Sequence, residues 1–247
     1  VKAEGISIPE IFKRGGEAVS KIGCPMDPGT HVWGVSGLVR NPGRYEIETG
    51  SCTLGELLHD LCGGPLAGRR FKAIIPGGSS MKILRWDEKF TIKNPDGTTT
   101  ERRTEDIPLD SASFMQCGTA IGSCGIIVMD NTIDMVEAMA NLNQFYAHES
   151  CGQCTPCREG TLWMSRITKR ICEGWGRPED VDLLKSVADN ICGRTICALG
   201  EGVAGTEQRL EIPRRVLREN PPPTGGRRSG SLGQQRLQTY LVWKPAR

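Results

Sequence analysis

Three cysteines separated by two residues each constrain this chain more than any other feature of its sequence. They form the run Cys151-Gly152-Gln153-Cys154-Thr155-Pro156-Cys157, a C-x2-C-x2-C pattern. A cubane iron–sulfur cluster needs several thiolates around one side of its volume, and two-residue spacers allow one irregular loop to supply them. Gly152 tolerates the backbone angles that such a loop requires. Pro156 suits the first position of a following helix with Thr155 as its cap, so the positive end of that helix would face the anionic cluster.

A fourth thiolate has to come from elsewhere in the chain, and the candidates are Cys172, Cys192 and Cys197. Cys172 lies in the same expected helix as the end of the triplet, roughly four turns further on at ~1.5 Å per residue, and cannot reach back. Cys192 and Cys197 lie beyond the next expected helix, where the chain can fold back beside the triplet. The irregular segment Gly193–Gly200 favours Cys197 modestly, because Cys192 is close enough to that helix to belong to it.

Zinc binding and disulfide formation are the two alternatives for clustered cysteines. Structural zinc sites usually combine two pairs of ligands, and three cysteines within seven residues are crowded for zinc. If zinc instead stabilised the helical bundle, the chain would be an interaction module. Metal analysis separates the two alternatives, since an iron–sulfur protein contains iron and acid-labile sulfide. Disulfides are typical of small secreted chains, and the length of 247 residues and the lack of a signal sequence argue against that class.

The remaining cysteines and the histidines show no metal-binding pattern. Lone cysteines are usually small buried hydrophobic residues, and this is the prediction for Cys24, Cys52, Cys62, Cys117, Cys124 and Cys172. The histidines are scattered along the chain, and His148 is expected at the surface or behind the ligands. Arg158, directly after the triplet, either screens the charge of the cluster or is an ordinary helix-surface residue.

Charge and hydrophobicity narrow the class of protein. Lys and Arg number 31 and Asp and Glu 29, and this net charge of +2 predicts neither a nucleic-acid binder nor a membrane-surface protein. No run approaches the ~18 consecutive apolar residues of a membrane helix. The first residues contain no basic segment leading into an apolar core, as a secretory signal would. The chain is therefore expected to be soluble and intracellular.

Residues 31–118 have the pattern of a small mixed domain. A β-rich stretch at His31–Val39, a turn at Asn41-Pro42-Gly43 and alternation after it predict a hairpin. Thr53 and Glu56 fit a capping box before a helix, whose expected apolar face consists of Leu54, Leu57, Leu58 and Leu61. Phe71–Ile75 predicts a further strand. Hairpin, helix and strand follow in the order of a β-grasp (ubiquitin-like) domain, here with a polar insertion at about 87–108.

The second part of the chain is predicted to be helical. After a short strand at Gly125–Met129, helices are expected from about residue 130, from about Pro156 to Glu173 and from about Glu179. The second is expected to bury a stripe of Trp163, Ile167 and Ile171. The fold class is therefore α+β, with a small helical bundle at 119–204 that holds the cluster. Residues 205–247 are rich in Pro, Gly and Arg without a hydrophobic period, and are predicted to form a disordered tail.

The runs His148–Gly160 and Thr195–Gly200 resemble the flavoprotein (NADH-oxidising) subunit of respiratory complex I, or NADH-quinone oxidoreductase. The diaphorase subunits of NAD-linked hydrogenases and formate dehydrogenases share the pattern. The resemblance covers about residues 31–202 and implies that Cys197 is the fourth ligand. One [4Fe-4S] cluster would then be held by Cys151, Cys154, Cys157 and Cys197.

The resemblance also implies a function. The cluster would take single electrons from FMN reduced by NADH and pass them to partner iron–sulfur subunits of a respiratory or diaphorase complex. Such a protein is expected in the cytoplasm, peripheral on the inner membrane through its partners, with no direct membrane insertion and no nucleic acid. No residue of this chain is assigned a catalytic role.

Two departures from the family shape the expectation. The Gly-rich Gly-Arg-Gly-Gly-type loop that binds FMN and NADH has only Arg14-Gly15-Gly16 as a fragmentary counterpart. We therefore expect the chain to correspond to the C-terminal half of the subunit, with residues 1–30 a remnant of the FMN/NADH-binding domain. By itself it should bind neither FMN nor NAD and should not oxidise NADH. The tail at 205–247 also differs from the helical tail with which the family usually ends. A truncated or frameshifted gene would produce such a difference.

Overall fold

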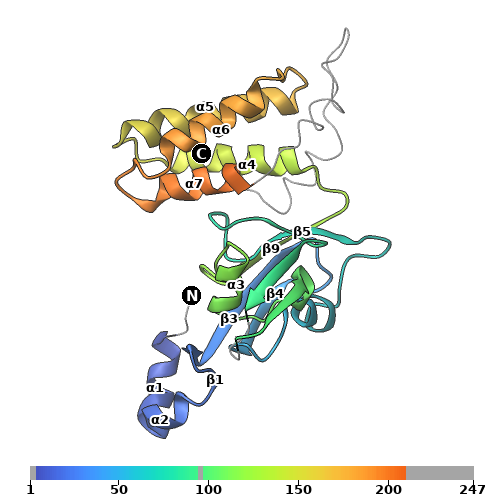
Figure 1. Ribbon diagram of the computed structural model, residues 1–247, viewed down its shortest axis with the longest axis vertical. Coiled ribbons are helices and arrows are strands. Elements are labelled where there is room, and N and C mark those ends of the chain that lie inside the picture. The colour runs from blue at the N-terminus through green and yellow to red at the C-terminus, as the bar shows by residue number, and fades with distance from the viewer. Residues whose placement is uncertain (1–3, 94–96, 210–247) are drawn as a thin grey trace. The chain divides into compact units, whose positions relative to one another are not determined.

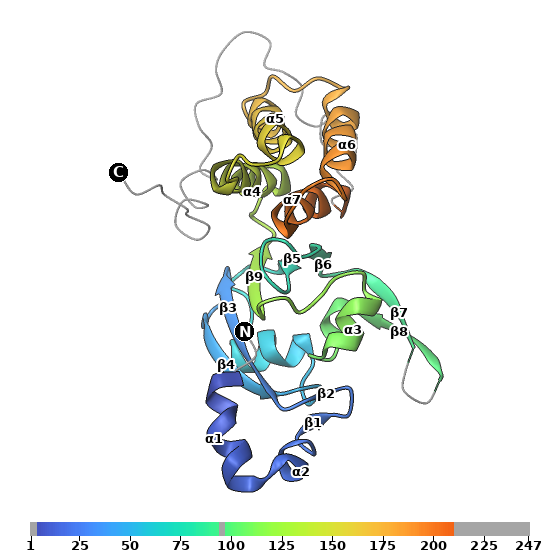
Figure 2. The same cartoon turned by 90° about the vertical axis from the view of Figure 1, so that its left-hand side faces the viewer.

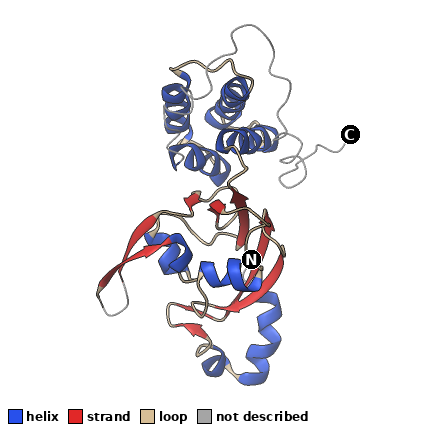
Figure 3. Ribbon diagram, turned by 90° about the vertical axis from the view of Figure 1, so that its right-hand side faces the viewer, coloured by secondary structure: helices blue, strands red, loops and turns tan. Residues whose placement is uncertain are grey.

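The chain forms two compact units, residues 1–131 and residues 132–247. The computed structural model describes residues 4–93 and 97–209. Within these ranges, all strands belong to the first unit and the second consists of helices joined by loops (Figure 3). This division lies later than the boundary predicted after residue 118, because strand β9 (Gly125–Asp130) pairs with strands of the first unit.

A mixed five-stranded sheet forms the centre of the first unit, with the order β4-β3-β9-β5-β6 (Figure 1). Strands β3 (Thr30–Gly37) and β4 (Gly43–Glu48) form the predicted antiparallel hairpin. Strand β9 lies between β3, to which it is parallel, and β5 (Phe71–Ile75), to which it is antiparallel. Strand β6 (Leu84–Arg85) completes one edge. Strand β9 is the central strand of the sheet, which explains why its sequence is an almost continuous apolar run rather than an alternating one.

Smaller elements surround this sheet. They are α1 (Glu4–Arg14), α2 (Gly16–Val19), β1 (Gly23–Cys24), β2 (Asp27–Pro28), the π-type turn η1 (Glu56–Leu61), β7 (Lys89–Lys93), β8 (Thr99–Arg103), the 3-10 turn η2 (Thr104–Asp106) and α3 (Ser111–Gln116). Strands β7 and β8 form a hairpin within the segment predicted as a polar insertion. Phe90 and Ile92 of β7 alternate with polar residues and pack into the core. The insertion is therefore polar on one face only.

The capping box predicted before η1 is confirmed. The Thr53 backbone N–H donates to Glu56 Oε2 at 2.7 Å, and the Glu56 N–H donates to Thr53 Oγ1 at 3.2 Å. The predicted apolar face is wrong at its end, because Leu61 is 48% exposed while Cys62 is buried. The Cys62 N–H donates to the carbonyl of Leu57, five residues back, which widens the turn and shifts the buried position by one residue.

The described residues of the second unit, 132–209, form four helices (Figure 2), namely α4 (Met135–Glu149), α5 (Thr155–Cys172), α6 (Asp180–Ile191) and α7 (Ala198–Arg209). Helix α5 packs against the other three, and α4 also contacts α7. Met139, Met164 and Ala188 are fully buried in their common core. No helix in the described ranges is long and apolar enough to cross a membrane.

Two expectations about these helices need correction. The predicted buried stripe of α5 includes Trp163, but this side chain is 53% exposed and Met164 is buried instead. The buried face of α5 is wide because it meets three helices, and it is centred one residue later than predicted. Helix α7 also continues to Arg209, and Gly205, the first residue of the predicted tail, is buried, so the chain is still packed where that tail was predicted to begin. The rest of that tail, residues 210–247, lies outside the described residues.

Candidate metal centre

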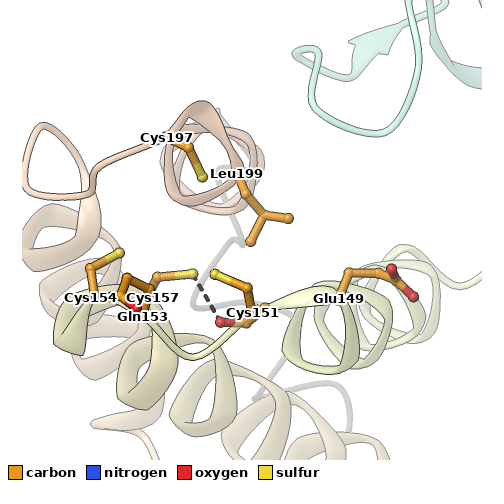
Figure 4. A pocket seen from close by; sticks show the side chains of 8 residues that line it. Glu149, Cys151, Gln153, Cys154, Cys157, Cys197 and Leu199 are labelled. Carbon is orange, nitrogen blue, oxygen red and sulfur yellow. Dashed lines mark hydrogen bonds between the residues drawn. The ribbon is translucent and has the colours of Figure 1, made fainter.

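Four cysteine side chains from two separate parts of the helical unit line one pocket. These are Cys151, Cys154, Cys157 and Cys197, and Figure 4 shows their sulfur atoms facing the space between the α4–α5 loop and α7. The pocket has a volume of about 100 Å³, whereas a single water molecule needs about 10–15 Å³. There is therefore room for a group of several atoms.

The other cysteines considered as ligands lie elsewhere. All eleven cysteines are in the described part of the chain, and neither Cys172 nor Cys192 lines the pocket. Cys172 is the last residue of α5, and Cys192 caps the C-terminus of α6. The Cys192 thiol donates to Glu201 Oε2 at 3.0 Å, so its side chain has a different partner.

The end of α4 and the start of α5 position the cysteine triplet. Gly152 adopts the left-handed conformation, with φ of +78°, as expected for a wrapping loop. The predicted cap of α5 is Thr155, but the extended residue Cys154 occupies the cap position and makes no side-chain hydrogen bond with the helix. The cap lies one residue earlier because Thr155 already has helical geometry. Cys157 consequently lies in the first turn, where the exposed N–H groups and the helix dipole favour a thiolate.

The turn between α6 and α7 positions Cys197. Thr195 Oγ1 donates to the carbonyl oxygen of Cys197 at 2.9 Å. Gly200 allows close packing here, because a Cβ on it would lie 2.5 Å from Thr195 Cγ2. The Glu201 carboxylate accepts hydrogen bonds from the Gly193 N–H and the Cys192 thiol. No local sequence pattern marks Glu201, since an acidic residue in the first turn of a helix is common and its hydrogen-bond partners are set by the tertiary structure.

The cysteines that line the pocket repel one another as thiolates, which favours a metal-containing occupant between them. Burial raises the pKa of the Cys157 thiol, and a hydrogen bond with Ser150 opposes this. Repulsion from the thiolates of Cys154, Cys197 and Cys151 raises the same pKa further. Metal ions bind cysteine as the thiolate, and their positive charge relieves such repulsion.

The donor set fits an iron–sulfur cluster. Soft thiolate ligands select zinc, copper(I) and iron–sulfur clusters. In a cubane each iron takes its own thiolate, so the sulfurs surround a shared volume. Among the residues with described positions, no three His, Cys, Asp or Glu side chains form a group that could hold a single metal ion.

Two further residues near the triplet have defined places. The Arg158 guanidinium donates to the Gly152 carbonyl at 2.8 Å and to Thr155 Oγ1 at 3.3 Å, and it also pairs with Glu159. Arg158 therefore braces the cysteine loop, a role that the sequence did not indicate. His148 is exposed, with Nδ1 3.0 Å from Glu149 Oε1, and does not line the pocket.

Known proteins are similar to this chain both in its helical unit and over most of its length. Residues 137–210 match the family model of the NADH-ubiquinone oxidoreductase-F iron–sulfur binding region. An F-type NADH-quinone oxidoreductase subunit of Rhizobium meliloti is 38% identical over 197 residues, which are 80% of this chain and 43% of the relative. The F-type subunit of Rickettsia felis is 39% identical over 85% of this chain and 47% of its own length.

A mitochondrial relative and a solved structure extend the comparison. NADH dehydrogenase [ubiquinone] flavoprotein 1 of Dictyostelium discoideum is 38% identical over 82% of this chain and 39% of the relative. The crystal structure of a NAD+-reducing [NiFe]-hydrogenase in the air-oxidized state shares the fold, with a TM-score of 0.70 and 24% identity over 95% of this chain and 37% of the hydrogenase chain.

The chain thus spans less than half the length of these curated relatives. The residues that match the family model include the whole cysteine triplet and Cys197. Residues 137–210 therefore match the iron–sulfur binding region of this family, and most of the chain is similar to part of the F-type subunits of NADH-quinone oxidoreductases.

Proposed function

We propose that this chain transfers single electrons through one [4Fe-4S] cluster held by Cys151, Cys154, Cys157 and Cys197. The observation that carries the proposal is the meeting of a compact triplet and a distant fourth thiol at one pocket. When bound, such a cluster supplies reversible one-electron oxidation and reduction. The protein contributes the thiolates, their spacing and their surroundings.

The elements around the pocket have distinct roles in this proposal. The first turn of α5 directs its N–H groups and positive dipole at the anionic centre, which stabilises the extra electron of the reduced state. Leu199 contributes an apolar wall, which lowers the local polarity and limits access of water. Arg158 keeps the Gly152 turn in place from the outer side.

The place of the cluster in a larger enzyme follows from the relatives. We propose that it receives electrons from NADH-reduced FMN and passes them to iron–sulfur subunits of a complex I-type or diaphorase complex. Association with the inner membrane would then be peripheral and through those partners. FMN and NAD are cofactors of the intact subunit in this proposal, and residues 1–247 alone bind neither.

We further propose that the first unit is a β-grasp domain that begins near residue 31. In support, its hairpin β3–β4, its parallel central pair β3–β9 and the strand order are those of a ubiquitin-like sheet. The helical cluster-binding domain would follow it, with residues 1–30 as the remnant of a preceding domain.

Metal analysis and spectroscopy of the purified chain test the central proposal. Anaerobic reconstitution should yield about four irons and four acid-labile sulfides per chain, with broad visible absorption, as a [4Fe-4S] cluster requires. Reduction with dithionite should produce an electron paramagnetic resonance signal. A colourless protein that contains zinc and no labile sulfide would overturn the proposal.

A further inference from the structure

Ser150 occupies the junction between α4 and the cysteine loop, and its side chain points at a proposed ligand. Its backbone N–H closes α4 by donating to the Tyr146 carbonyl at 3.1 Å, and its backbone is extended, with φ of −62° and ψ of 120°. The hydroxyl Oγ lies 3.2 Å from Cys157 Sγ, the contact drawn as a dashed line in Figure 4. The end of one helix is thus linked to the first turn of the next through a hydroxyl–sulfur contact.

The direction of this hydrogen bond follows from the chemistry of the two groups. A metal-bound cysteine is a thiolate and can only accept. The Ser150 hydroxyl has one proton to give and lone pairs to receive, and the Gly152 N–H donates to the same Oγ at 3.4 Å. With its acceptor side occupied by Gly152, the hydroxyl proton is directed at Cys157.

Because Cys157 is buried, a hydrogen bond to its sulfur should stabilise negative charge more strongly than a similar hydrogen bond to one of the other pocket cysteines. Cys157 is 5% exposed, whereas Cys151 and Cys197 are exposed and Cys154 is half-buried in this chain. Hydrogen bonds to charged groups are stronger than neutral ones, and a low local dielectric strengthens them further. Reduction adds negative charge to the cluster and its thiolates, so a donor to sulfur stabilises the reduced state more than the oxidised state.

We infer that Ser150 is a positioning residue whose hydroxyl donates to the Cys157 thiolate and raises the reduction potential of the bound cluster. The inference rests on the proposed function and goes beyond it, because it assigns control of the potential to a side chain that is not a ligand.

A redox titration of the full 247-residue chain, monitored by electron paramagnetic resonance, tests the inference. Ser150→Ala removes the donor. Ser150→Thr and Ser150→Val form a matched pair of nearly equal shape, with and without the hydroxyl, and the extended backbone at this position accepts β-branched residues. Ser186→Ala removes an exposed serine on α6 and serves as the control.

The midpoint potential should shift to more negative values in the Ala and Val variants and should remain at the wild-type value in Ser150→Thr and Ser186→Ala. After exchange into D2O, deuteron couplings from backbone N–H groups should be common to all variants, whereas one further coupling, from the hydroxyl, should be present in wild type and Ser150→Thr and missing from the Ala and Val variants.

Three other results would each overturn the inference. Equal midpoints in all variants would refute the tuning role and leave the cluster assignment intact. Cluster loss from both the Ala and Val variants, with normal loading of Ser150→Thr, would show that the hydroxyl holds the cluster rather than sets its potential. Wild-type protein without iron and labile sulfide would refute the proposed function together with the inference.

Discussion

At the scale of single residues, the four pocket cysteines are not equivalent. Cys157 is buried in the first turn of α5, while Cys197 is exposed and comes from a turn that follows another helix. The triplet can preorganise itself locally, since its members are close in sequence. Cys197 depends on the packing of the whole helical unit, so we expect it to be the most sensitive test of the proposed ligand set.

Replacing Cys197 by Ser should strip most of the iron from the protein, because a serine hydroxyl is a poor substitute for a thiolate at an iron–sulfur centre. Iron and sulfide content with visible absorption provide the measurement. The matched control is Cys172→Ser at the far end of α5, where the thiol does not line the pocket and the absorption should persist. Equal loss of iron from both variants would contradict the assignment.

At the scale of elements, the turn between α6 and α7 has to hold Cys197 over the pocket. Glu201 joins the two helices there, because its carboxylate on α7 binds the Gly193 N–H and the Cys192 thiol at the end of α6. These two hydrogen bonds also lower the pKa of the Glu201 carboxyl, led by the contact with Cys192. The charged carboxylate of Glu201 thus fixes the turn together with the close packing of Thr195 on Gly200.

Glu201→Ala should therefore weaken retention of the cluster. Loss of outer hydrogen-bond partners typically costs about 10–100-fold in metal affinity, and we expect on the order of tenfold faster loss of iron to a chelator. Glu173→Ala is the matched control, since Glu173 pairs only loosely with Lys169 at 4.0 Å on the surface of α5. If both variants lost iron at the wild-type rate, Glu201 would have no role in placing Cys197.

A second inter-helix contact joins α5 to α6. The Arg170 guanidinium binds both carboxylate oxygens of Asp180, which is 2% exposed and also accepts from the Arg177 N–H at 2.8 Å. Removal of one partner from such a pair leaves a buried charge without compensation. This contact therefore matters for the stability of the helical unit rather than for the chemistry of its pocket.

Arg170→Met should lower the free energy of unfolding by roughly 1–3 kcal/mol, because Asp180 is buried while Arg170 is partly exposed, so the pair lies between a surface and a fully buried ion pair. Denaturant unfolding of the chain monitored by circular dichroism gives the value. Lys185→Met provides the comparison, because the Lys185–Asp189 pair on α6 is exposed and should contribute less than about 1 kcal/mol. A similar small effect of both substitutions would show that Asp180 is adequately solvated without Arg170.

At the scale of the whole molecule, the chain combines a sheet-based unit with a helical unit, and only the second contains the proposed cluster ligands. The sequence has only a fragment, Arg14-Gly15-Gly16, that resembles the glycine-rich loop expected for FMN and NADH. The uptake of electrons from NADH and their transfer through the cluster are thus expected to be separable functions.

The reconstituted 247-residue chain should be reduced by dithionite but not by NADH, with or without added FMN. Dithionite donates electrons without a specific binding site, whereas hydride transfer from NADH requires a bound flavin. Bleaching of the visible absorption measures the reduction. Rapid bleaching by NADH alone would show that residues 1–247 contain a flavin and nicotinamide site that the sequence did not reveal.

The sequence by itself determined the local features of this protein. The hairpin β3–β4, the capping box at Thr53 and Glu56, and the strand Phe71–Ile75 follow from side-chain alternation, turn residues and short-range hydrogen bonding. The spacing of the cysteine triplet predicts iron–sulfur chemistry in the same way. Each of these signals involves residues close together in the chain.

Only the tertiary structure decided the features that depend on distant neighbours. Strand β9 joined the sheet rather than the helical unit, because its partners lie more than fifty residues before it in the chain. The exposure of Trp163 depends on where α4, α6 and α7 contact α5. The contacts of Ser150 with Cys157 and of Glu201 with Gly193 join residues only seven and eight positions apart, but they too form only when consecutive helices pack together, and no local sequence pattern specifies that packing.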